Sequence, residues 1–73
     1  MAEKYCLVGV DGNAYAVMGY VQRAMREQGY TKEDCDAYFK RATSGNYDNL
    51  LCESVAMIDA CNERAGEVDD VED

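Results

Sequence analysis

Cysteine is the most reactive side chain that this sequence offers for catalysis or metal binding. The four cysteines are Cys6, Cys35, Cys52 and Cys61, and the chain has no histidine. Without histidine it lacks both the commonest base for activating a thiol and the commonest metal ligand. The cysteines stand 29, 17 and 9 residues apart, so the C-x2-C spacing of many zinc sites is missing. We therefore expect free thiols that act as small buried hydrophobic side chains, and no cysteine nucleophile.

Two further motifs could bind a ligand, but each lacks part of the pattern that its chemistry needs. Glu33, Asp34 and Asp36 form an acidic cluster suited to Mg²⁺ or Ca²⁺, yet the glycine and the final glutamate of an EF-hand loop are missing. Acidic residues in the first turn of a helix interact favourably with the helix dipole, so their presence here does not require a bound metal. The glycine-containing run 9–13 lacks the Lys-Ser/Thr of a phosphate-binding loop, and Asp11 would repel a phosphate. The sequence therefore predicts a protein that is not an enzyme and that uses no cofactor or metal.

The charge of the chain excludes two large classes of ligand. The 73 residues include 15 acidic and 7 basic ones, which gives a formal net charge of −8. Nucleic acids and anionic membrane surfaces both need a cationic protein surface, so we expect neither as a direct partner. No run approaches the roughly 20 apolar residues of a membrane span, and the N-terminus does not resemble a secretion signal. These features favour one small cytoplasmic protein.

The spacing of the apolar residues predicts an all-α fold, because they recur every three or four residues over three stretches. We expect helices over about 13–28, 32–43 and 47–65. Their buried stripes are predicted to be Ala14, Val17, Met18, Val21, Ala24 and Met25; Cys35, Tyr38, Phe39 and Ala42; and Tyr47, Leu50, Leu51, Ser54, Val55, Ile58, Cys61 and Ala65. The three-helix domain covers residues 1–66. Residues 67–73 form an acidic tail that we expect to be solvated and mobile.

Local signals predict where these helices begin and end. The expected N-caps are Asp11 or Asn13 for the first helix, Thr31 for the second, and Ser44 or Asn46 for the third. Thr31 is followed three residues later by an acid, which resembles a capping box. Gly29 and Gly66 are expected to end the first and third helices.

An apolar run, Tyr5–Val10, precedes the helices and is typical of one short extended segment. No second strand-like run follows, so its edge must pair with a second copy, pair with another protein or lie over the helices. A chain of this size buries only about 60% of its unfolded surface, and association is a common remedy. Gly19, inside the first predicted helix, indicates that a close packing partner needs the space. We therefore expect a homodimer.

Tyrosines and acids supply the candidate interaction residues. The chain has six tyrosines and one phenylalanine, and tyrosine suits interfaces because its ring can pack while its hydroxyl meets water. The tyrosines that fit an interface best are Tyr15, Tyr20 and Tyr30. The acids on the third predicted helix, which could copy the phosphates of nucleic acid, are Asp48, Glu53, Asp59 and Glu63. Their spacings of 5, 6 and 4 do not form one row, so a simple solvated face stays open as an alternative.

Two stretches of the chain resemble a known protein family. They are VGVDGNAYAVMG, beginning at Val8, and ATSGNYDNLL, beginning at Ala42. Both resemble small uncharacterised proteins of bacteriophages, prophages and bacterial mobile elements, which have a DGNAF…G start and an EATSGDYDxLL middle. The resemblance spans about residues 6–60, with Tyr15 in place of Phe, Arg41 in place of Glu and Asn46 in place of Asp. It implies an accessory protein that works in the cytoplasm of a bacterial host.

Three functions remain open at this stage. The first, which we favour, is a non-enzymatic accessory protein that binds a host protein and inhibits it through an acidic surface, for example a defence or nucleic-acid-processing protein. The second is a small-molecule or nucleotide-binding protein, with the ligand at a homodimer interface. The third is a structural or regulatory accessory of the mobile element.

Overall fold

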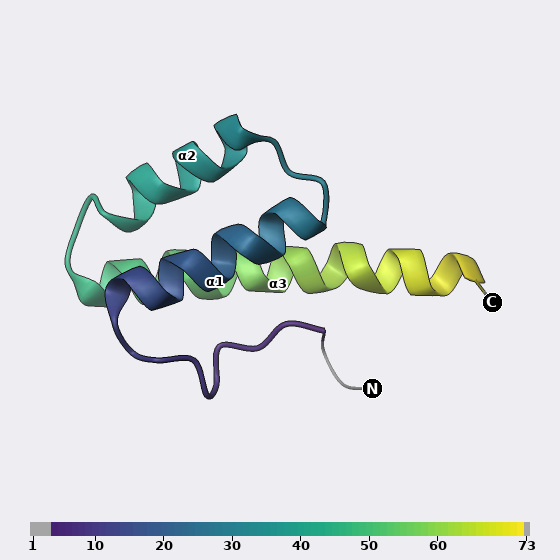
Figure 1. Cartoon of the computed structure of the whole chain (residues 1–73), viewed down its shortest axis with the longest axis horizontal. Coiled ribbons are helices and arrows are strands. Elements are labelled where there is room, and N and C mark those ends of the chain that lie inside the picture. Colours follow the sequence, from purple (N-terminus) through teal and green to yellow (C-terminus); the bar gives the residue numbers. More distant parts are fainter. Residues whose placement is uncertain (1–3, 73) are drawn as a thin grey trace.

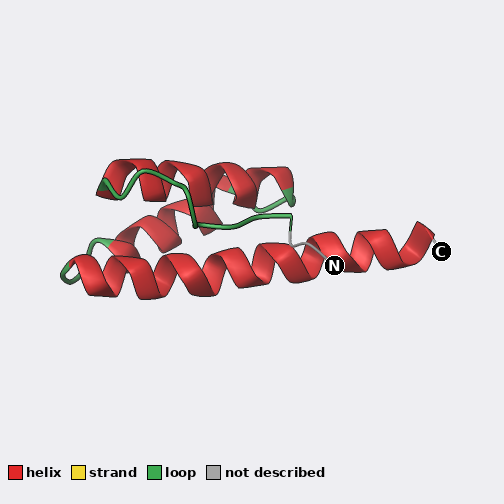
Figure 2. Cartoon of the chain, turned by 90° about the horizontal axis from the view of Figure 1, so that it is seen from below, coloured by secondary structure: helices red, strands yellow, loops and turns green. Residues whose placement is uncertain are grey.

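Three α-helices make up the fold, as a computed structural model of the chain shows (Figure 1). The structure describes residues 4–72, and their side chains over residues 4–66. The helices are α1 (Ala14–Glu27), α2 (Lys32–Ala42) and α3 (Tyr47–Glu72). Both α1 and α2 pack against α3, and no strand occurs within residues 4–72 (Figure 2). The predicted all-α class with three helices is confirmed.

Side-chain caps define the three helix starts. Asn13 caps α1, because its Oδ1 accepts the backbone N–H two residues later at 2.8 Å. Thr31 and Asp34 form both bonds of a capping box at the start of α2, each 3.1 Å long. Asn46, rather than Ser44, caps α3 and accepts the N–H three residues later at 3.0 Å. Each start therefore lies where the sequence predicts it.

Gly29 ends α1 as predicted, through a left-handed backbone conformation with a φ of +87°. The N–H of Tyr30 donates to the carbonyl of Met25 at 3.0 Å, and the N–H of Gly29 donates to that of Arg26 at 3.1 Å. This pair of bonds is a Schellman motif, which satisfies two of the free carbonyls at the helix end.

The helix end predicted at Gly66 is wrong, because α3 continues to Glu72. Gly66 does not have a positive φ, so it does not adopt the left-handed conformation of a C-terminal cap. A glycine inside a helix costs only about 1 kcal/mol relative to alanine, and the chain has no proline to stop the helix nearby. The backbone of most of the expected tail is therefore helical. The side chains of residues 67–73 lie outside those that the structure describes.

The core forms where the three apolar stripes meet. Its buried side chains are Tyr5, Val17, Met18, Val21, Ala24, Met25, Cys35, Tyr38, Ala42, Leu50, Ser54, Ile58, Cys61 and Ala65. Three residues predicted to be buried are instead 41%, 43% and 50% exposed, namely Phe39, Tyr47 and Val55. Each lies at the margin of its stripe. A three-helix bundle covers only the face of each helix that points at the other two, so the margins stay open to water.

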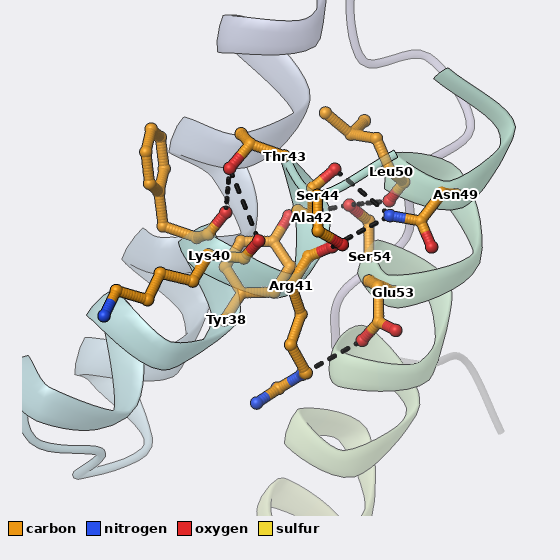
Figure 3. Close-up of polar contacts among 11 residues, drawn as sticks. Tyr38, Lys40, Arg41, Ala42, Thr43, Ser44, Asn49, Leu50, Glu53 and Ser54 are labelled. Carbon is orange, nitrogen blue, oxygen red and sulfur yellow. Dashed lines mark hydrogen bonds and ion pairs between the residues drawn. The ribbon is translucent and has the colours of Figure 1, made fainter. Parts of the chain in front are cut away.

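A polar chain crosses the core between α2 and α3. The hydroxyl of Tyr38 lies 2.6 Å from that of Ser54, and both side chains are fully buried (Figure 3). Ser54 donates its single hydroxyl hydrogen to the carbonyl of Leu50 at 2.7 Å, so Tyr38 must be the donor to Ser54. Burial raises the pKa of Tyr38 above its ordinary value, because the phenolate would lose its hydration.

The N-terminal segment packs on its own chain. The amide of Asn62 on α3 brackets the backbone of Tyr5: its Oδ1 accepts the N–H at 2.8 Å, and its Nδ2 donates to the carbonyl at 2.9 Å. A turn then joins Leu7 to Val10 by a 3.1 Å bond, with Gly9 at a φ of +91°. The predicted continuous extended run is therefore interrupted by a turn. Because the segment lies over its own helices, it no longer argues for a second copy, and the homodimer stays a prediction.

Gly19 gives a direct test of that homodimer. It is exposed in the middle of α1, and apart from the adjacent residues and backbone of α1 itself nothing in the described chain lies within 4 Å of the position that a Cβ would take. The close partner expected from the sequence is therefore not supplied by the described part of the same chain. We expect Gly19→Ala to raise the free energy of unfolding by about 0.5–1 kcal/mol, since alanine lowers the entropy of the unfolded chain.

Urea unfolding measures this change, with light scattering at the same protein concentrations. Gly19 would lie in a dimer interface if the wild type has twice the mass of 8.1 kDa and the alanine variant has the mass of one chain. That result would contradict the expected stabilisation.

Candidate interaction surface

Two of the three candidate tyrosines make contacts within the chain itself. Tyr20 is half-buried, and its hydroxyl accepts the backbone N–H of Cys6 at 2.9 Å. Tyr30 is also half-buried, and the guanidinium of Arg64 lies 4.4 Å from the centre of its ring, a cation–π distance. Tyr20 thus holds the N-terminal segment on α1, and Tyr30 holds the α1–α2 loop on α3.

Tyr15 has a different environment, because 79% of it is exposed. It lines a groove of about 360 Å³ at the point where the start of α1, the end of α2 and the start of α3 meet. Phe39 and Tyr47, the two aromatic residues wrongly predicted to be buried, line the same groove. Exposed rings from three helices therefore surround one concavity, which we call the aromatic groove.

The floor of the aromatic groove is apolar and belongs to the core. It contains the buried side chains of Met18, Ala42 and Leu50, each at most 4% exposed, beside the half-buried Ala14. The remaining lining residues are Thr43, Gly45 and Asn46, so none of them carries a charge. A rigid, uncharged floor of this kind favours the burial of apolar side chains.

Three polar side chains of the lining already have partners inside the chain, whereas the exposed hydroxyl of Tyr15 has none among the described residues. Thr43 donates its hydroxyl to the carbonyl of Phe39 at 2.8 Å. The hydroxyl of Tyr47 donates to the carbonyl of Gly12, which fixes the ring against the loop before α1. The Oδ1 of Asn46 is occupied by its capping bond. The groove therefore offers mainly apolar contact to a ligand.

The connection between α2 and α3 is held rigidly beside the groove. Asn49 donates through Nδ2 to the carbonyl of Arg41 at 2.8 Å, which satisfies a free carbonyl at the end of α2 (Figure 3). A Cβ at Gly45 would lie 3.1 Å from the Cβ of Asn49, so this close approach favours glycine. These contacts position the ring of Tyr47 at the first residue of α3.

The four acids predicted on α3 do not act as one group. Glu53 accepts a bond from Nε of Arg41 at 3.1 Å, so its charge is offset by a residue of α2 (Figure 3). Asp48, Asp59 and Glu63 are exposed. At 100° per residue, these three lie within about 60° of one another around the axis, separated along it by about 17 Å and 6 Å. They form one acidic edge of α3, on the same side as the half-exposed Val55.

A second concavity, of about 300 Å³, lies where the N-terminal segment meets α1. It is lined by Lys4, Tyr5, Tyr20, Arg23, Ala24 and Glu27. The carboxylate of Glu27 accepts the hydroxyl of Tyr5 at 2.8 Å and pairs with Arg23 at 3.6 Å. These contacts fasten the segment to α1 and account for the charges of Arg23 and Glu27.

The cysteines follow the prediction only in part. All four are free thiols; Cys35 and Cys61 are buried in the core, whereas Cys6 and Cys52 are exposed. Burial raises the pKa of the Cys61 thiol above its ordinary value, which keeps this thiol protonated and unreactive. Among the described side chains, no three cysteine, aspartate or glutamate residues converge as a metal site would require.

Comparison of the chain with known proteins identifies no relative. Over the described residues, none of the three helices combines the length and apolarity needed to cross a membrane. No family model, curated protein or solved structure matches the chain. Its function is therefore inferred from its own groove and charges.

Proposed function

We propose that this protein acts by binding another protein, without catalysing a reaction, and that the aromatic groove is its contact surface. The observation that carries the proposal is the convergence of Tyr15, Phe39 and Tyr47 on one uncharged concavity. Aromatic rings in pockets supply most of the binding energy in many protein interfaces. Clustered exposed apolar side chains on a small soluble domain are themselves a sign of an interaction site.

The acidic edge of α3 supports this proposal, because it favours a partner with a positively charged surface. Asp48, Asp59 and Glu63 are exposed, and the only base on α3 is Arg64, whose guanidinium stacks on Tyr30. A partner with a basic surface is attracted over about a Debye length, roughly 8–10 Å at physiological salt. If that basic surface normally holds nucleic acid, occupying it would inhibit the partner.

The setting that we propose is the cytoplasm of a bacterial host, with a host protein as the partner of a phage or mobile-element accessory protein. The two stretches that resemble such proteins, 8–19 and 42–51, contribute every lining residue of the groove except Phe39. The groove is thus built almost entirely from the two stretches that carry the resemblance.

Loss of two groove rings should weaken partner binding by about 10- to 100-fold. We would capture the partner from bacterial lysate with the wild-type chain and then measure its affinity for a Tyr15→Ala/Phe39→Ser variant. The matched control is Val8→Ser, which removes an apolar side chain that is 88% exposed but lies outside the groove lining. We expect the control to bind like the wild type.

Equal binding by the groove variant and the wild type would contradict the proposed contact surface. Neutralising the acidic edge, with Asp48→Asn, Asp59→Asn and Glu63→Gln together, should instead slow association and reduce its dependence on salt. Circular dichroism of each variant shows whether the three helices are retained.

A further inference from the structure

We infer that the aromatic groove receives an amphipathic α-helix of the partner, with basic residues beside its apolar anchors. This inference rests on the proposed function and specifies the occupant of the same site. Three observations carry it: the internal hydrogen bonds that already occupy Thr43, Asn46 and Tyr47, the arrangement of the rings of the groove, and the charges beside it.

The hydrogen bonding of the groove favours a helix over an extended peptide. An extended peptide needs partners for its own backbone N–H and C=O groups, which a sheet edge usually supplies. No strand occurs within residues 4–72, and the side chains of Thr43, Asn46 and Tyr47 already bond within the chain. A helix satisfies its backbone internally, so it loses no hydrogen bonds when it enters an apolar groove.

The shape of the groove suits the side chains of one helical face. Its rings come from three different helices, Tyr15 from α1, Phe39 from α2 and Tyr47 from α3, and they surround the floor formed by Met18, Ala42 and Leu50. A volume of about 360 Å³ falls in the range of concave binding sites. Helices enter such grooves with apolar anchors three or four residues apart.

The charges beside the groove favour a cationic helix. Asp11 precedes Gly12, whose carbonyl binds the Tyr47 hydroxyl, and Asp48 follows Tyr47; both acids are exposed. The lining itself is uncharged; at the same end of α2, Arg41 is paired with Glu53, and the exposed Lys40 next to Phe39 is a single base against the two acids. Lysine or arginine residues flanking the apolar anchors would therefore meet acids at the edge of the groove.

A second copy of this chain is a poor match for the groove. All three of its helices already pack into one bundle, and the end of α3 that projects beyond α1 and α2 is rich in acids (Figure 1). An acidic helix end would be repelled by Asp11 and Asp48, so the occupant has to come from another protein.

The test uses the full chain and four labelled synthetic 18-residue peptides, with affinity read from fluorescence anisotropy. The first has leucines at i, i+3, i+4 and i+7 with lysines elsewhere, and the second replaces every lysine by glutamate. The third has the composition of the first with its four leucines at every second position, i, i+2, i+4 and i+6, which favours an extended strand, and the fourth has it in scrambled order. We expect the first peptide to bind at least about tenfold more tightly than each of the others.

Groove variants show whether that binding occurs at the inferred site. Phe39→Ser should weaken binding of the first peptide by about tenfold or more, whereas Val8→Ser, of the same net charge, should leave it unchanged. Asp11→Asn with Asp48→Asn should weaken it by a few-fold, and more at low salt than at high salt. Asparagine at position 11 retains an oxygen to accept the N–H of Asn13.

Several outcomes would overturn the inference. The helix is wrong if the alternating peptide binds more tightly than the first peptide and its binding depends on Phe39. The cationic character is wrong if the glutamate peptide binds as tightly as the lysine peptide. The site is wrong if Phe39→Ser leaves binding of the first peptide unchanged, and a second copy is the occupant if the free chain has a doubled mass that Phe39→Ser abolishes. If the natural partner still depends on Phe39 while the helical peptide does not, the helix is wrong and the groove is right. If neither depends on Phe39, the proposed function fails as well.

Discussion

Replacing Leu50 by alanine should lower the free energy of unfolding by about 2–5 kcal/mol. Leu50 is 4% exposed and belongs to the core cluster while it also forms part of the groove floor. Its removal leaves a cavity that neighbouring helices can close only in part. Small domains have total stabilities of about 5 kcal/mol upward, so this loss removes a large part of the stability of the protein. Urea unfolding followed by circular dichroism measures the loss.

The neighbouring positions on α3 provide matched controls for this prediction. Leu51 is half-buried at the edge of the core, and Val55 is 50% exposed. Leu51→Ala should therefore cost less than Leu50→Ala, and Val55→Ala should cost under about 1 kcal/mol. Equal losses for Leu50 and Val55 would show that α3 is rotated about its axis relative to the structure described here.

Ser54→Ala should destabilise the protein by about 1–3 kcal/mol, although it removes only one oxygen atom. The reason is the fully buried Tyr38, whose hydroxyl has Ser54 as its partner at 2.6 Å. Without Ser54, this hydroxyl stays buried and unpaired, and the cost of removing it from water is no longer offset. Tyr38→Phe should cost less, because Ser54 would keep its bond to the carbonyl of Leu50.

A double-mutant cycle isolates the contribution of this bond. In the Ser54→Ala background, Tyr38→Phe removes the unpaired hydroxyl and should be neutral or stabilising. The expected coupling between the two positions is about 1 kcal/mol or more, measured by urea unfolding of the four proteins. Strictly additive losses would mean that the two hydroxyls do not interact in solution.

The sequence predicts the helices well because their signals are local. Asn13, Thr31 and Asn46 each act within three residues of their own position, and so does Gly29 at the end of α1. Such signals work in the same way in any tertiary context, which explains why the three helix starts agree with the prediction. Gly66 is the counterexample, since glycine permits a helix end without requiring one.

The aromatic groove could not be predicted because periodicity does not show how far burial extends around a helix. Phe39 and Tyr47 occupy positions that fit an apolar stripe, so the pattern assigns them to the core. Their exposure depends on the angles at which the three helices cross, which is tertiary information. Conversely, Tyr20 and Tyr30 fit an interface by residue type, but both make contacts inside the fold. Tyr20 accepts a hydrogen bond from Cys6, and Arg64 stacks on the ring of Tyr30.

The acidic residues show the same limit in another form. The helical period places Glu53 on another side of α3 from Asp59 and Glu63, but only the structure shows that Arg41 pairs with it at 3.1 Å. The N-terminal segment differs from its prediction for a local reason, since Gly9 lies within an apolar run and allows the turn from Leu7 to Val10. An isolated glycine in such a run is the one signal that favours a turn over a strand.

The pair of hydrogen bonds between Asn62 and the backbone of Tyr5 affects the order in which the chain folds during its synthesis. The two residues are 57 positions apart, so this pair cannot form until Asn62 has been synthesised, whereas the contacts of the segment with Tyr20 and Glu27 of α1 are available earlier. During elongation α1 and α2 can form and meet, and the Tyr5 hydroxyl can reach Glu27, but the backbone of Tyr5 stays without its partner on α3. Closure of the N-terminal segment over the bundle is therefore a late step of folding, which requires that α3 has formed as far as Asn62.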